Sequence, residues 1–166
     1  YNGTDLFGPN DTITRGQVAC VLFNMAGGSS SMDDSQYDEN KGWVSFSDVD
    51  GKMYYGQAIA WAKNAGVVHG YAGTDDFRPD ATITREEFAA MLANYAVKNG
   101  SALPSDVDAL LADKSDGSTV SDWAKASVAW AVQNKVMGNG GFIAPFSNTT
   151  RAETAAMVVN YDNSVK

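Results

Sequence analysis

The chain has 166 residues, of which 44% are hydrophobic and 19% charged, proportions that are ordinary for a folded domain or a small array of repeats. Its formal net charge of −8 argues against binding to nucleic acid and against broad electrostatic attachment to an anionic membrane. No apolar run reaches the roughly 18 residues that a membrane-spanning helix needs, so we expect no membrane insertion. The single cysteine, Cys20, excludes an internal disulfide framework and most zinc sites, and we expect no cofactor.

The first predicted element is a helix that begins at Arg15, within the segment GTDLFGPNDTITRGQVACVLFNMA at residues 3–26. Thr14 followed three positions later by Gln17 is the pattern of a capping box. We expect Cys20 to be a small buried residue of this helix. The chain opens with YNGTD, without an initiator methionine or a signal peptide, so we expect a processed product or a fragment.

The next region contains an exposed loop and then two predicted helices. Residues 28–45 are polar and rich in Gly, Ser and Asp, which is typical of a loop. Apolar residues recur at helical spacing over about 54–65, and Gly66 is expected to end that helix. A loop punctuated by glycine and proline follows, and Thr84 with Glu87 predicts the start of the second helix.

The last third repeats this helix–loop–helix pattern after an insertion. Within residues 98–110, Ser105 is expected to cap one short extra helix. Residues 111–166 then align with 46–97, and the aligned partners are Asp48 with Asp113, Tyr54 with Trp123, and Trp61 with Trp130. We expect the last pair, which lies in helix interiors, to belong to the core.

The whole chain is therefore organised by an internal repeat. Residues 3–26 align without a gap to 73–96, and residues 142–161 align to the same stretch. The predicted parts are the second half of repeat 1 (1–27), a polar loop (28–45), repeat 2 (46–97), the insertion (98–110) and repeat 3 (111–166). Neither helix of a repeat is long enough to be stable alone, so stacking of the repeats is expected to build the core of an all-α fold with about six helices and no substantial sheet.

Three of the four arginines occupy the same place in this repeat. TITRGQ, TITREE and NTTRAE place Arg15, Arg85 and Arg151 directly after a capping threonine. The helix dipole disfavours a cation at this position. We infer that an acidic chain with three arginines at such positions uses them for something other than helix stability.

The sequence FRPDATITREEFAAML at residues 77–92 follows a Trp-bearing helix and a G-V-V-x-G turn. This pattern resembles the S-layer homology (SLH) repeat of bacterial cell-surface proteins, over most of 46–97 and 111–161 and the half repeat at 1–27. The resemblance implies that three repeats form a pseudo-threefold helical bundle or spindle. It also implies that grooves between repeats bind an acidic, often pyruvylated, secondary cell-wall polysaccharide. A secreted protein would thereby be anchored non-covalently to the bacterial cell wall or S-layer.

The resemblance also implies which residues bind the glycan. The family's binding arginine falls on Arg15, Arg85 and Arg151, and the weaker candidates are the acids Asp48 and Asp113 and the aromatics Tyr54 and Trp123. A pyruvate ketal carries a carboxylate, which free N–H groups at a helix start and the fork of a guanidinium would hold together. Two alternatives stay open: the arginines pair with carboxylates such as Asp48 or Asp113, and the two aromatics pack in the core.

Three other functions stay open beside glycan binding. The repeats could be a structural self-assembly module of a surface layer, with the incomplete first repeat as the contact. DVDG at 48–51 and DKSDG at 113–117 resemble parts of calcium loops, although neither continues into the full calcium-loop spacing. A glycan-cleaving enzyme needs only two carboxylates, but the lone histidine, His69, has no nucleophile motif beside it, and we expect no enzyme.

The first repeat departs from the other two. Gly16 stands where a better helix former is usual, and no Trp-bearing helix precedes this copy in the chain. The apolar side of its helix is formed by Val18, Val21, Leu22 and Met25. We expect residues of a longer parent protein to cover this side, with the segment 102–112 or a neighbouring molecule as alternatives.

Overall fold

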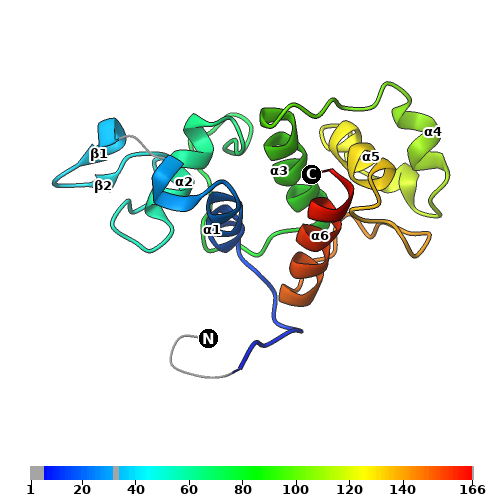
Figure 1. The fold of residues 1–166 in the computed structure, drawn as a ribbon, viewed down its shortest axis with the longest axis horizontal. Coiled ribbons are helices and arrows are strands. Elements are labelled where there is room, and N and C mark those ends of the chain that lie inside the picture. Colours follow the sequence, from blue (N-terminus) through cyan, green and yellow to red (C-terminus); the bar gives the residue numbers. More distant parts are fainter. Residues whose placement is uncertain (1–5, 32–33, 166) are drawn as a thin grey trace. The chain divides into compact units, whose positions relative to one another are not determined.

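The computed structural model describes residues 6–31 and 34–165, and helices dominate those ranges (Figure 1). The α-helices described are α1 (Arg15–Met25), α2 (Gly56–Asn64), α3 (Arg85–Lys98), α4 (Val107–Ala112), α5 (Lys125–Gln133) and α6 (Arg151–Ser164). Short 3₁₀ turns lie at Gly28–Ser31, Asp34–Gln36 and Gly117–Thr119, and the strands β1 (Tyr37–Asp38) and β2 (Gly42–Trp43) form one antiparallel pair. The predicted all-α helical repeat fold is confirmed.

The three helices that follow a Thr-Arg pair all begin where the sequence predicts. α1, α3 and α6 each start at the arginine, and the preceding threonine is the N-cap in an extended conformation. In each helix the threonine hydroxyl accepts the N–H of the residue three positions on. The Gln or Glu side chain of that residue accepts the threonine's own N–H. The reciprocal bonds satisfy two backbone donors that the helix itself leaves unpaired.

The other helix boundaries follow the predictions in part. The C-cap of α2 is Ala65, and Gly66 follows with φ 69°, the left-handed conformation that ends many helices. The prediction that Ser105 caps the extra helix is wrong, because the N-cap of α4 is Asp106. The expected loop at 28–45 also contains the β1–β2 hairpin.

The described chain divides into two compact units, residues 14–81 and residues 6–13 with 82–165, which we call the 14–81 unit and the 82–165 unit. In the 14–81 unit α1 packs against α2 (Figure 1). The rings of Phe23 and Trp61 lie 5.6 Å apart, and Val18 and Leu22 are completely buried. Val18 and Leu22 are therefore covered by the Trp-bearing helix of the following repeat, contrary to the expectation that residues of a longer parent protein, the segment 102–112 or a neighbouring molecule cover this side.

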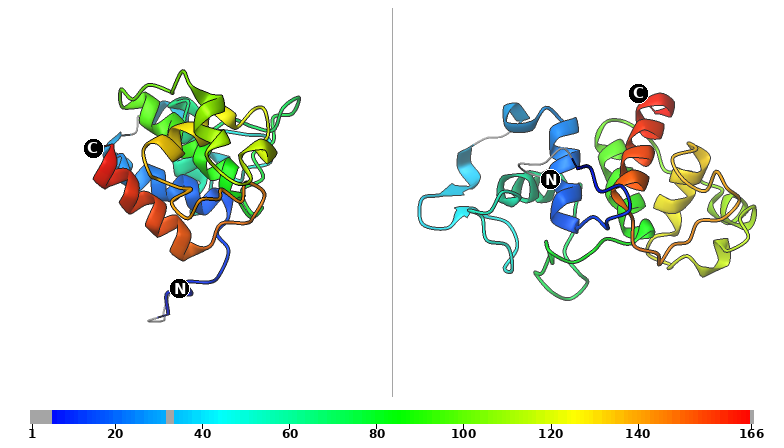
Figure 2. Two further views of the ribbon diagram at one scale, coloured as in Figure 1. Left: turned by 90° about the vertical axis from the view of Figure 1, so that its right-hand side faces the viewer. Right: turned by 90° about the horizontal axis from the view of Figure 1, so that it is seen from below.

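The same pairing recurs in the 82–165 unit, where α3 packs against α5 of the following repeat. The ring of Tyr161 in α6 lies 5.8 Å from Tyr95 in α3 and 6.2 Å from Trp130 in α5, so the three helices share one core (Figure 2). α4 packs on α5 and extends this core. Trp61 and Trp130 are both buried, as predicted.

A cycle of backbone hydrogen bonds joins segments of all three repeats within the 82–165 unit. The N–H of Ile13 donates to the carbonyl of Thr149 at 3.1 Å, Ile83 donates to Ile13 at 3.1 Å, and Thr149 donates to Ile83 at 2.9 Å. Each of the three precedes the capping threonine of its repeat, and none is more than 4% exposed. Within this unit the cycle fixes the residues that directly precede the starts of α3 and α6.

Candidate functional site

All three predicted arginines make the same contact with a loop of another repeat. The Nε atoms donate to carbonyl oxygens: Arg15 to Phe77 at 2.8 Å, Arg85 to Ile143 at 2.7 Å and Arg151 to Phe7 at 2.8 Å. Each acceptor stands two positions before the proline of its loop. The contact uses only one of the guanidinium's N–H donors and fixes the plane of the group. We call these places the Arg15, Arg85 and Arg151 sites.

The backbone donors at the helix starts are already bonded, which corrects the prediction that they are free for an anion. In α1 the N–H of Arg15 donates to Ala81 at 3.0 Å and that of Gly16 to Pro79 at 2.8 Å. The corresponding bonds run from Arg85 and Glu86 to Ser147 and Pro145, and from Arg151 and Ala152 to Asp11 and Pro9. A helix start inside a fold needs such partners, and the loop carbonyls supply them. An anion at these sites would therefore be held by the guanidinium.

In the Arg15 site, two aromatic rings contact the guanidinium, and a carboxylate holds the neighbouring loop. Cζ of Arg15 lies 4.7 Å from the ring centroid of Tyr71 and 4.8 Å from that of Phe77, and Arg15 is 5% exposed. The carboxylate of Asp48 accepts the backbone N–H groups of Phe77 at 2.8 Å and Arg78 at 2.7 Å. Asp48 thus holds the loop whose carbonyl positions Arg15.

The acid with this role in the Arg85 site is Asp116, and not Asp113 as the sequence alignment predicted. Asp116 accepts the N–H groups of Ile143 at 2.8 Å and Ala144 at 2.7 Å. The signal that identifies it is a Ser-Asp pair, because Ser115 and Ser47, which precede the two acids, both donate from N and Oγ to a carbonyl of the loop. A shift of three residues in the alignment hid this match.

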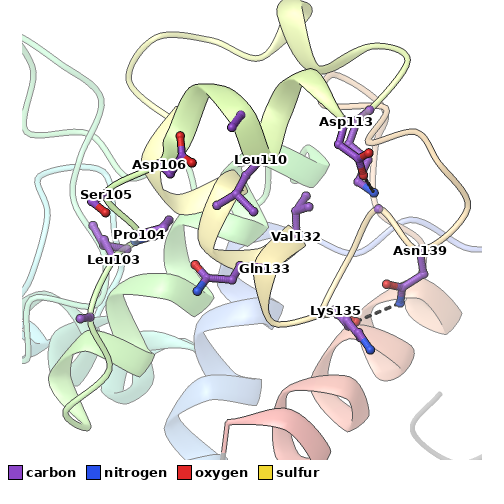
Figure 3. A pocket seen from close by; sticks show the side chains of 14 residues that line it. Leu103, Pro104, Ser105, Asp106, Leu110, Asp113, Val132, Gln133, Lys135 and Asn139 are labelled. Carbon is purple, nitrogen blue, oxygen red and sulfur yellow. Dashed lines mark hydrogen bonds and ion pairs between the residues drawn. The ribbon is translucent and has the colours of Figure 1, made fainter.

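Asp113 lies in a pocket beside α4 that none of the three arginines lines. Its side chain is exposed and forms an ion pair with Lys114 at 3.0 Å. The open pocket has a volume of about 1080 Å³, and Asp113 lines it together with Leu110, Val132 and Lys135 (Figure 3).

The Arg85 and Arg151 sites differ from each other in charge and exposure. Nη1 of Arg85 forms an ion pair with Oε1 of Glu153 at 2.9 Å, and the Arg85 side chain is 12% exposed. Cζ of Arg151 lies 5.0 Å from the ring centroid of Phe7, whose exposure is 51%. The residues that match Phe7 in the other two loops are completely buried.

The two predicted aromatic residues are exposed, so the alternative that they pack in the core does not hold. Tyr54 is 64% exposed, and its hydroxyl interacts with the side chains of Gln17 and Thr14 at the start of α1. Partial burial raises the pKa of this hydroxyl. Trp123 is 62% exposed and follows Ser121, whose N–H and hydroxyl donate to Glu86, the residue next to Arg85. Tyr54 therefore contacts the start of α1, and Trp123 lies two residues after a serine that contacts the start of α3.

Within residues 6–31 and 34–165, no group of three or more His, Cys, Asp or Glu side chains is arranged to hold a metal ion. Asp48 and Asp116, from the two segments that resemble calcium loops, bind backbone N–H groups instead. No helix of that part is long and apolar enough to cross a bilayer.

Comparison with known proteins identifies the repeat. The S-layer homology domain family matches residues 2–19, 45–89 and 115–155. An amylopullulanase of Thermoanaerobacterium thermosulfurigenes is 31% identical over 90% of this chain, and an endoglucanase of Bacillus sp. (strain KSM-635) is 30% identical over 92%. The surface-layer 125 kDa protein of Lysinibacillus sphaericus is 30% identical over 79%. The chain spans 8%, 15% and 10% of the lengths of these three proteins.

The matches agree with the structure at the level of the repeat, because the matched segments carry all three capped, arginine-first helix starts. They also cover more than half of the chain. The chain therefore belongs to the S-layer homology domain family, the cell-wall-anchoring domain of secreted bacterial surface proteins.

Proposed function

We propose that the chain anchors a surface protein to the cell wall by binding an acidic, carboxylate-bearing secondary cell-wall polysaccharide, with pyruvate ketals as the charged groups. The binding residues in this proposal are Arg15, Arg85 and Arg151, with Tyr54 and Trp123 as stacking surfaces for sugar rings. Asp48 and Asp116 position the loops and do not touch the glycan. Asp113, which lies beside the pocket of Figure 3, has no role in this proposal.

The observation that carries the proposal is the repetition of one arrangement at three places. Each guanidinium is oriented by a loop carbonyl through its Nε atom at 2.7–2.8 Å, although the chain as a whole has a formal charge of −8. A planar guanidinium fixed in this way is suited to a bidentate contact with a carboxylate. Since the helix-start N–H groups are bonded to protein carbonyls, the arginines are the groups at these places that can hold the anion.

The enzyme names of two relatives do not extend to this chain in our proposal. Those proteins are 31% and 30% identical to it over only 8% and 15% of their own lengths. We assign their catalysis to other parts of those chains. This chain is proposed to be a non-catalytic binding module, so incubation with purified wall polymer should release no soluble sugar.

A retention experiment tests the glycan proposal. Purified cell-wall polymer would be immobilised before and after mild acid hydrolysis of its ketals, and retention of the chain measured on both. Binding to the intact polymer and a loss of most binding after hydrolysis are expected. Equal retention on both preparations would contradict the proposal. Retention that persists in excess calcium chelator would remove a calcium-dependent mechanism.

Self-association is the second candidate, and a specific observation favours it. Leu6 is 68% exposed and Phe7 is 51% exposed, next to each other in the loop that binds Arg151. Burial of two such side chains between molecules would stabilise a dimer or a layer contact. Sedimentation should then show an oligomer that Phe7→Ser weakens. A monomer over the whole concentration range would remove this candidate.

A further inference from the structure

The fourth arginine, Arg78, occupies a position that the other repeats fill with small residues. The residues before the loop prolines are Gly8, Arg78 and Ala144, with φ of 61°, 57° and 52°. A left-handed conformation is strained for any residue with a Cβ and is easiest for glycine. The backbone therefore does not call for a long charged side chain at Arg78. Such a residue at a strained position suggests a functional use.

The guanidinium groups of Arg78 and Arg15 both lie against the aromatic ring of Tyr71. Cζ of Arg78 lies 4.3 Å from the ring centroid of Tyr71, and Cζ of Arg15 lies 4.7 Å from the same centroid. The two guanidinium groups are thus no further apart than the sum of these distances. The ring attracts each cation, but the like charges repel one another. An anion within reach of both groups would be attracted by both charges.

The position of Arg78 is firmly set, and its side chain is accessible. Its N–H donates to Asp48 at 2.7 Å, which holds the strained residue in place. The residue is exposed, and within the described ranges its guanidinium forms no ion pair. In the Arg85 site, Ala144 stands at the matching position and offers no second charge.

We propose that Arg78 is a second anion-binding residue, and that it makes the Arg15 site a two-cation site for the carboxylate of an acidic sugar. This inference rests on the proposed glycan function and adds a difference between the sites. The Arg15 site should bind an acidic sugar more tightly, and with a steeper dependence on salt, than a site with one arginine.

The test is calorimetric titration with a defined probe, the methyl glycoside of a hexose that carries one pyruvate ketal. A background with Arg85→Ala and Arg151→Ala leaves the Arg15 site as the arginine site under study. In this background Arg78→Gln removes the charge and keeps a side chain of similar shape. Lys41→Gln, at an exposed residue of the same unit, removes the same charge elsewhere. Arg78→Gly serves as a second variant because it relieves the backbone strain.

We expect Arg78→Gln and Arg78→Gly to weaken binding about tenfold and to flatten its salt dependence, as the loss of one charge-assisted contact predicts. Lys41→Gln should change neither quantity, and Arg78→Lys should keep the salt dependence. If both Arg78 variants bind like the background, Arg78 is not a ligand-binding residue. If the background does not bind while the parent does, the Arg15 site is not the one occupied. If the parent itself does not bind the probe or the wall polymer, the glycan proposal fails and this inference with it.

Discussion

The carboxylate of Glu153 bridges Arg85 and the cap of the next arginine-bearing helix. Its Oε1 accepts from Nη1 of Arg85 at 2.9 Å, and its Oε2 accepts from the N–H of Thr150 at 2.9 Å. One residue of the Thr-Arg motif in repeat 3 therefore caps its own helix and pairs with the arginine of repeat 2. The ion pair also places a negative charge beside a guanidinium that we propose binds an anion.

Glu153→Gln should strengthen binding of an acidic sugar at the Arg85 site. The amide can still accept from Thr150, as Gln17 does from Thr14 in α1, but it no longer competes for Arg85. Because the Glu153 side chain is 42% exposed, the ion pair contributes under about 1 kcal/mol to stability. We expect affinity for the pyruvylated glycoside to rise about fivefold, measured with Arg15→Ala and Arg151→Ala present. A weaker affinity would show that Glu153 orients Arg85 for binding.

Gly16→Ala should destabilise the chain, although alanine favours helices. A Cβ on Gly16 would lie 3.0 Å from the carbonyl oxygen of Pro79 and 3.1 Å from Cδ1 of Tyr55. Alanine normally gains roughly 0.5–1 kcal/mol over glycine in a helix, but this overpacking costs about 1–3 kcal/mol. Urea unfolding checks the sign. As a matched control, Ala152→Gly at the same position of α6 should lower stability by the propensity term alone, and a Gly16→Ala variant more stable than the parent would refute the contact.

Thr149→Val should stabilise the chain. The hydroxyl of Thr149 is buried and has no hydrogen-bond partner among the described residues. Valine keeps the shape of the side chain and removes the unpaired hydroxyl, so the free energy of unfolding should rise by about 1 kcal/mol. Thr154→Val is the control, because that buried hydroxyl donates to the carbonyl of Thr150 at 2.9 Å, and its loss should not stabilise. Equal effects of both changes on the thermal midpoint would contradict the conclusion that the Thr149 hydroxyl is unpaired.

Cys20 should be unreactive in the folded chain at neutral and mildly alkaline pH. Burial raises the pKa of its thiol from 9.0 to about 11. A neutral thiol is a poor nucleophile, so iodoacetamide should label it slowly until denaturant is added. Because the folded pKa is the higher one, this group's contribution to stability is complete below pH 9 and is lost as the pH rises towards 11. Cys20 is only partly buried, and not fully buried as the sequence predicted, and fast labelling of the native chain at pH 8 would show that this partial burial does not protect the thiol.

The helix starts could be predicted from sequence because their signal is local. Thr14 with Gln17, and the two matching pairs, specify capping within four residues. The partner of α1 could not be predicted in this way, because packing between repeats is not local. The sequence order suggested a preceding Trp-bearing helix, whereas Trp61 of the following repeat lies against Phe23.

The sequence predicts the arginines of the three sites, but it does not predict the groups that surround them. A motif places Arg15, Arg85 and Arg151, but the oxygen atoms around them belong to backbone carbonyls, which carry no side-chain signal. Asp116 could not be assigned from sequence, because gaps make the alignment of repeats 2 and 3 ambiguous around this residue. The left-handed conformation of Arg78 could not be inferred, since the residue before a proline usually avoids it.

The central claim is that fixed arginines hold the carboxylates of a cell-wall glycan, and an arginine series measured on intact and ketal-free polymer tests it most directly. Arg85→Ala and Arg151→Ala, separately and together, should leave the thermal midpoint near that of the parent. Each should weaken binding to intact polymer by about 1.5–3 kcal/mol at its site, less where another site still binds. Lysine at either position should restore only part of the loss, because it lacks the bidentate fork. Parent-like affinity of the double alanine variant for intact polymer would show that these two arginines are structural and would contradict the account.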